Sequence, residues 1–192
     1  NVKYAIRNIA AEAARVAAGG TRLVPCNIGD PLRFDFATPP HLVEAVAKAL
    51  RDGHNHYVPS AGLQEARDAV AASMRPAVRP IDVFVTAGVS EALDLLLTAL
   101  LEPGDEVLLP SPGYPLYNAI AARLQAVAKP YYLDEARGWA LDAQALEAAI
   151  GPRTKAVIVC NPNNPTGAVA TRAQLEAVLD VARRHKLVVI SD

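Results

Sequence analysis

The residues best suited to chemistry stand where short apolar runs end. Residues 161–167, NPNNPTG, directly follow the β-branched run KAVIVC and contain two Asn-Pro pairs. A residue before proline is kept out of the helical region, so the amide of Asn164 is held at a fixed angle and can donate a hydrogen bond to a ligand oxygen. Turn formation alone explains one Asn-Pro pair, whereas two pairs ending in Thr-Gly favour a binding role.

Asp192 is the second such residue. It follows LVVIS, a run whose composition predicts a strand buried on both faces. A carboxylate at the end of a buried strand is costly unless a cation or a hydrogen-bond donor meets it. Exposure in a loop is the alternative, but Asn164 at the end of a neighbouring strand favours a shared polar site.

The segment TAGVSEAL places Gly88 and Ser90 where a predicted strand turns into a helix. The backbone N–H groups of the first helical turn, around Val89 and Ser90, are then free to bind an anion such as phosphate. The alternative is purely structural, with Ser90 acting as the N-cap of its own helix.

Two tyrosines open the next predicted helix. Tyr114 and Tyr117 lie three positions apart in SPGYPLY, where an aromatic ring could stack on a flat heterocycle. Such a contact contributes roughly 1 kcal/mol beyond the burial of area. Core packing is the alternative for both, and it is favoured more for Tyr117.

Short β-branched runs alternate with helical segments and predict the elements that position these residues. Strands are expected at VFVTAG, EVLLPS, KPYYL, KAVIVCN and LVVIS, and a helix is expected between each strand and the next along the chain. This pattern predicts an α/β fold with three layers, in which a mostly parallel sheet of buried strands carries helices on both faces. Ligands of such sheets bind beyond the carboxyl ends of the strands. Further helices are expected over residues 5–18, after Pro39-Pro40 and near Ser60.

Composition limits the classes of partner. The 192 residues are 52% apolar and carry a formal charge of -1, from 19 basic and 20 acidic side chains. This balance argues against a nucleic-acid surface and favours small-molecule partners.

No apolar run approaches the roughly 20 residues of a membrane span, and the start lacks the features of a signal peptide. Cys26 and Cys160 lack metal-ligand spacing, so we expect no metal site and a cytoplasmic location. Cys160 ends a buried strand and is predicted to be a small core residue.

The order GVSEAL, PGYPLY, NPNNPTG and an aspartate after VVIS resembles the fold-type I pyridoxal-phosphate enzymes, in particular the class I/II aminotransferases. NIGDP and HYVPSAG look most like the subgroup that includes alanine aminotransferases. The resemblance implies that pyridoxal 5′-phosphate is the cofactor. Asp192 would pair with its ring nitrogen, Asn164 would donate to its phenolic oxygen, and Tyr114 would stack on its ring. The backbone at Val89 and Ser90 would hold its phosphate.

The resemblance also implies roles for residues in the first part of the chain. Tyr57 of HYVPSAG would reach the phosphate of the neighbouring subunit's cofactor, which implies a homodimer. Gly29 of NIGDP would lie close to the substrate carboxylate. Residues 1–36 are expected to form an N-terminal arm and small-domain segment, and residues 37–192 the cofactor-binding large domain.

The family's Schiff-base lysine is expected beyond Asp192. None of the lysines in this sequence stands in a matching context: Lys3, Lys48, Lys129, Lys155 and Lys186. We therefore expect the chain to be the N-terminal part of a longer enzyme, with a large domain that is incomplete, and to be inactive alone.

The implied activity is transfer of an amino group between an amino acid and a 2-oxo acid, with alanine or glutamate as candidate donors. Two alternatives stay open. The first is a pyridoxal-phosphate-dependent β-lyase of the same fold, and the second is an aminotransferase-like regulatory domain.

Overall fold

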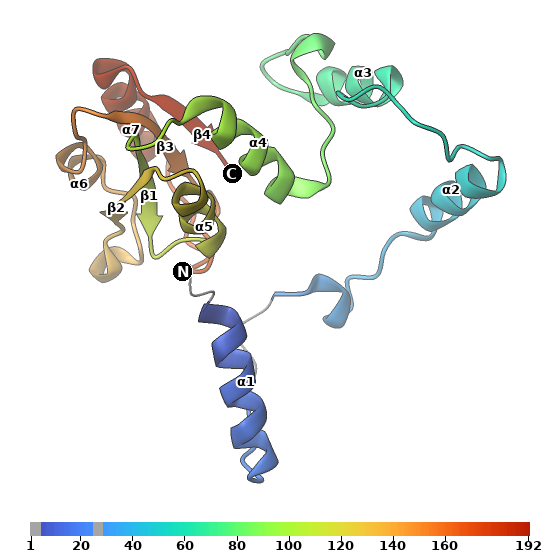
Figure 1. Ribbon diagram of the computed structural model, residues 1–192, viewed down its shortest axis with the longest axis horizontal. Coiled ribbons are helices and arrows are strands. Elements are labelled where there is room, and N and C mark those ends of the chain that lie inside the picture. Colours follow the sequence, from blue (N-terminus) through green and yellow to red (C-terminus); the bar gives the residue numbers. More distant parts are fainter. Residues whose placement is uncertain (1–4, 25–28) are drawn as a thin grey trace. The chain divides into compact units, whose positions relative to one another are not determined.

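The computed structural model describes residues 5–24 and 29–192 (Figure 1). The chain divides into two compact units, of which the first ends at Val85 and the second begins at Thr86. Cys26 lies outside the described residues. The domain boundary after residue 36, which rests on the family resemblance, stays a prediction.

The second unit is built on a parallel sheet with the strand order β2-β1-β3-β4. The strands are β1 (Glu106–Ser111), β2 (Val127–Tyr132), β3 (Thr154–Val159) and β4 (Val188–Ser191). The helices are α4 (Gly88–Leu100), α5 (Pro115–Arg123), α6 (Ala143–Ala148) and α7 (Arg172–His185). Strands and helices alternate along the chain from β1 onward, so the predicted α/β class with a parallel sheet is confirmed.

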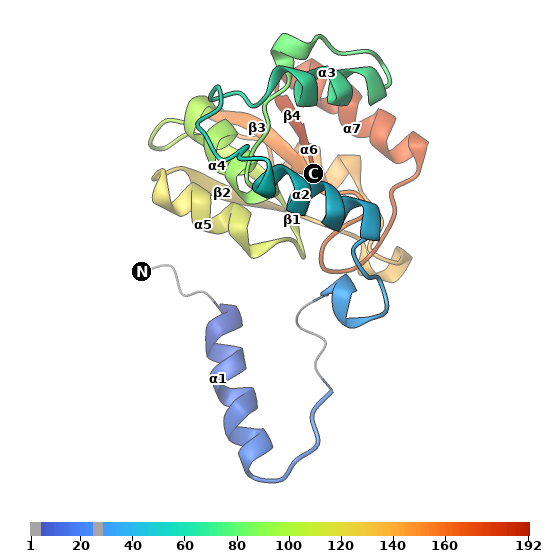
Figure 2. The same cartoon turned by 90° about the vertical axis from the view of Figure 1, so that its right-hand side faces the viewer.

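Helices cover both faces of this sheet because successive side chains of a strand point to opposite sides. Val107 and Leu109 of β1 belong to a core cluster with Leu97 of α4 and residues of α5. Leu108, between them, belongs to a second cluster with Leu146 of α6 and residues of α7. Figure 2 shows α4 and α5 on one side of the strands and α7 on the other. The three-layer prediction is therefore confirmed.

Burial is uneven among the strands. β1 and β3 occupy the centre of the sheet and are mostly buried, whereas β2 and β4 are partly exposed. The prediction that LVVIS is buried on both faces is wrong, since Val188 is 43% exposed. Within the described residues β4 pairs only with β3, so its other edge has no strand against it.

No strand forms at VFVTAG, and this prediction is also wrong. Backbone groups of Val83 and Val85 bond to other parts of the first unit instead: the Val85 N–H donates to the Ala61 carbonyl at 3.0 Å. The Val83 carbonyl accepts from the Arg67 guanidinium at 3.0 Å. A β-branched run becomes a strand only when another strand meets its edge, and none does so within residues 5–24 and 29–192.

The first unit contains the three helices expected there. They are α1 (Ala5–Ala18), α2 (Pro40–Arg51) and α3 (Gln64–Ser73). Arg67 of α3 is buried and also donates to the Pro80 carbonyl at 2.8 Å, which ties α3 to the 3-10 turn Pro80–Asp82. None of the helices that the structure describes has both the length and the apolar character that a membrane crossing requires.

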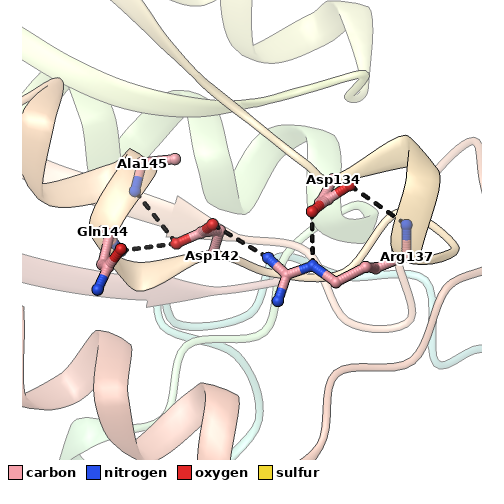
Figure 3. A network of polar contacts seen from close by, with 5 residues as sticks. All are labelled: Asp134, Arg137, Asp142, Gln144 and Ala145. Atoms are coloured by element: carbon pink, nitrogen blue, oxygen red, sulfur yellow. Dashed lines mark hydrogen bonds and ion pairs between the residues drawn. The ribbon is translucent and has the colours of Figure 1, made fainter.

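A polar network fixes the start of α6 (Figure 3). The Asp142 carboxylate accepts from the backbone N–H groups of Gln144 at 2.8 Å and Ala145 at 3.2 Å, as an N-cap does. Arg137 donates to Asp142 at 3.2 Å and to Asp134 at 2.5 Å. The hydrogen bond from Arg137 lowers the pKa of Asp134. Arg137 thus links the turn after β2 to the cap of α6.

Replacing Asp142 with alanine is expected to lower the free energy of unfolding of the complete protein by about 0.5–2 kcal/mol, because α6 loses its capping acceptor. Urea unfolding measures the change. The control is Asp180→Ala on α7, where the side chain is 68% exposed and the cost should stay below about 0.5 kcal/mol. Equal effects of the two variants would contradict the capping role.

Candidate functional site

A cavity of about 360 Å³ lies at the carboxyl ends of β1, β3 and β4. Its volume falls within the range of about 300–1,000 Å³ that is typical of small-molecule sites. It is lined by Val89, Ser90, Tyr114, Cys160, Asn161, Pro162, Asn164 and Asp192. All five candidate residues of the second unit are in this set, so the fold brings them together from four separate segments of the chain.

Asp192 extends the pairing of β3 and β4 by one residue. Its backbone N–H donates to the Val159 carbonyl at 3.0 Å, and its carbonyl accepts from the Asn161 N–H at 2.9 Å. These two hydrogen bonds fix the backbone at the point where the carboxylate meets the cavity. As predicted, Asp192 and Asn164 follow neighbouring strands.

Tyr117 contacts a residue of the cavity wall through a hydrogen bond that the sequence did not predict. It is fully buried in the core, as expected, but its hydroxyl also donates to Oδ2 of Asp192. Burial, together with the hydrogen bond to Asp192, raises the pKa of the Tyr117 phenol above its ordinary value. The hydroxyl therefore stays protonated and remains a donor to the carboxylate.

Tyr114 borders the cavity at the start of α5. It is half-buried and stands directly before Pro115, the first residue of the helix. The ring of Tyr117 meets it edge to face, with centroids 5.5 Å apart and an interplanar angle of 89°. This arrangement is favourable for aromatic pairs and supports the position of the Tyr114 ring.

The asparagines of NPNNPTG differ in position: two of them hold the loop together and the third borders the cavity. Oδ1 of Asn161 accepts from the Ala170 N–H at 2.9 Å, and Nδ2 of the buried Asn163 donates to the Thr166 hydroxyl at 2.9 Å. Both Asn-Pro peptide bonds are cis. The loop is thus held by Asn161 and Asn163, while the exposed Asn164 borders the cavity.

The N-terminus of α4 presents unused donors to the same cavity. The N-cap is Ala87, which supplies no side-chain acceptor, so the alternative that Ser90 caps this helix is wrong. Within the described residues no acceptor meets the backbone N–H groups of Val89 and Ser90. Free N–H groups and the positive end of the helix dipole both suit an anion.

Cys160 is not the core residue that its strand context predicted. It is half-buried and lines the cavity, because β3 ends one residue earlier. Its Sγ accepts from the Asn164 N–H at 3.4 Å.

Tyr57 and Gly29 belong to the first unit, whereas the cavity is formed by residues of the second unit. Both are exposed. Their roles stay predictions.

The donor set has a definite chemical character. It combines a carboxylate, a side-chain amide, an aromatic ring and a helix N-terminus around one cavity. These groups suit a flat heterocycle that carries a protonated nitrogen, an oxygen acceptor and a phosphate.

A second cavity, of about 190 Å³ beside Trp139 and Asn163, contains none of the predicted site residues. Among the described residues no group of three or more His, Cys, Asp and Glu side chains could hold a metal ion.

The chain is similar to aminotransferases in both sequence and structure. Residues 22–192 match the family described as aminotransferase class I and II. The chain is 39% identical to the alanine aminotransferase of Mycobacterium tuberculosis, over 100% of this chain and 46% of that protein. It is 37% identical to a glutamate-pyruvate aminotransferase of Escherichia coli, over 100% of this chain and 48% of that protein. The solved alanine aminotransferase from Pyrococcus furiosus matches with a TM-score of 0.94 and 41% identity, over 100% of this chain and 50% of that one. The chain spans about half the length of the curated relatives it matches.

Proposed function

Because the chain belongs to the aminotransferase class I and II family, we propose that the complete protein transfers an amino group between an amino acid and a 2-oxo acid. The cofactor of this proposal is pyridoxal 5′-phosphate. The observation that carries it is the convergence of Val89, Ser90, Tyr114, Asn164 and Asp192 on one cavity. When bound, the cofactor would supply an electron sink for the reacting amino acid.

Each of these five residues has a task that its chemistry suits. The Asp192 carboxylate holds the proton on the ring nitrogen, because a nearby negative charge favours the protonated form. The Asn164 amide donates a hydrogen bond to the phenolic oxygen. Tyr114 packs on the ring, and the N–H groups of Val89 and Ser90 bind the phosphate at the positive end of α4.

The proposed substrates follow from the names of the relatives. An alanine aminotransferase and a glutamate-pyruvate aminotransferase are each at least 37% identical to this chain, which supports alanine and glutamate as amino donors. These relatives give no support to a β-lyase or a regulatory domain. The proposal has three further parts. The protein forms a homodimer in which Tyr57 reaches the partner's cofactor. The substrate carboxylate binds near Gly29, and the protein is located in the cytoplasm.

The test uses the complete protein, since the chain spans about half the length of the curated relatives it matches. Adding alanine or glutamate should change the visible absorbance of the bound cofactor, and adding a 2-oxo acid should reverse the change. An absorbance that responds to no amino donor would contradict the proposal. Release of ammonia and pyruvate without a 2-oxo acid acceptor would indicate a lyase instead.

A further inference from the structure

Tyr117 contacts two residues of the cavity wall without lining the cavity itself. Its hydroxyl donates to Oδ2 of Asp192, 75 positions along the chain, and its ring supports Tyr114 edge to face. Its side chain is 0% exposed and belongs to the core cluster formed by α4, α5 and the sheet. A side chain so enclosed has a fixed position, so it can impose that position on the groups it touches.

The orientation of the Asp192 carboxylate depends on this contact. The two backbone hydrogen bonds of Asp192, with Val159 and Asn161, fix its Cα but leave the side chain free to rotate. Within residues 5–24 and 29–192, the hydrogen bond from Tyr117 is the one that the carboxylate accepts. It engages Oδ2, which leaves Oδ1 available to a ligand.

We propose that Tyr117 is a positioning residue that holds Asp192 with one oxygen engaged and the other directed to the ring nitrogen of the bound cofactor. This inference rests on the proposed function and deepens it. A protonated phenol is a suitable partner, because it donates to the carboxylate without adding a competing charge. Tyr117 touches no reacting atom and acts only through Asp192 and Tyr114.

The first test deletes only the hydroxyl. In the apo form of the complete protein, Tyr117→Phe is expected to raise the Kd for pyridoxal phosphate about tenfold, as loss of a hydrogen bond to a charged group should. The ring remains, so its contact with Tyr114 is kept. Quenching of intrinsic fluorescence measures the Kd, and thermal unfolding checks that the variant folds. If Tyr117→Phe does not fold, Tyr117→Met is used in its place, because methionine also lacks a hydrogen-bond donor.

Tyr131 offers a matched control. It is 1% exposed, and its hydroxyl donates to a backbone carbonyl, that of Ile158, at 2.8 Å. It packs in the cluster on the opposite face of the sheet. Tyr131→Phe therefore removes a comparable buried hydroxyl, but the Kd should stay within about twofold of the unsubstituted protein. An equal rise of the Kd in Tyr117→Phe and Tyr131→Phe would show a general structural effect and overturn the inference.

A double-mutant cycle tests whether Tyr117 acts through Asp192. In an Asp192→Ala background, Tyr117→Phe should change the Kd by less than about twofold, because the carboxylate it positions is gone. A tenfold effect in both backgrounds, or none in the unsubstituted protein, would overturn the positioning role and leave the proposed function intact. Failure of the unsubstituted protein to bind pyridoxal phosphate would overturn both.

Discussion

Replacing Asp192 with asparagine in the complete protein is expected to lower kcat/KM for amino transfer by about 10²–10⁴-fold. The carboxylate would be the counter-charge of the protonated ring nitrogen, and removing one partner of a shielded ion pair costs about 3–5 kcal/mol. Each 1.4 kcal/mol corresponds to about a factor of ten in kcat/KM. Asparagine keeps the shape of the side chain and still accepts from Tyr117, so the fold should survive. Steady-state kinetics with alanine and 2-oxoglutarate measure the loss.

The control for this charge removal is Asp180→Asn. Asp180 lies on α7 with its side chain 68% exposed, and it is not among the residues that line the cavity. Its kcat/KM should stay within about twofold of the unsubstituted protein, since exposed charges of this kind contribute little. A loss of less than about tenfold in Asp192→Asn would argue that the ring nitrogen needs no counter-charge from this residue.

The largest loss of stability is expected from Leu146→Ala. Leu146 is 0% exposed on α6, in the cluster that joins α6 and α7 to the sheet. Truncating a buried leucine loses its transfer free energy and leaves a cavity, which together cost about 2–5 kcal/mol. Urea unfolding of the complete protein, monitored by circular dichroism, should show a correspondingly lower free energy of unfolding.

Leu179→Ala on α7 makes the same chemical change at a site that is 38% exposed. It should cost less than about 1 kcal/mol, because little apolar surface returns to water and no closed cavity forms. Similar costs for the two leucines would mean that the α6 cluster is not a packed core.

Much of the site could be predicted from local sequence. NPNNPTG and the aspartate after an apolar run each mark the end of a predicted strand that forms, and parallel strands bring their ends to one edge. The glycine and serine of GVSEAL mark the start of α4, although VFVTAG before them forms no strand. The structure places Asn164, Asp192, Tyr114, Val89 and Ser90 around one cavity at that edge. The ends of these elements could be predicted because residue type and hydrophobic periodicity are set by a few neighbouring positions of the chain.

Contacts between distant residues required the tertiary structure. Periodicity and apolar content are local properties, so the helices and the central strands could be predicted without the structure. Only the fold decided that Tyr117 reaches Asp192, that Cys160 leaves the core for the cavity wall, and that VFVTAG finds no strand partner. Burial and pairing depend on which segments meet in space, and residues 75 positions apart in the chain, like Tyr117 and Asp192, share no local pattern.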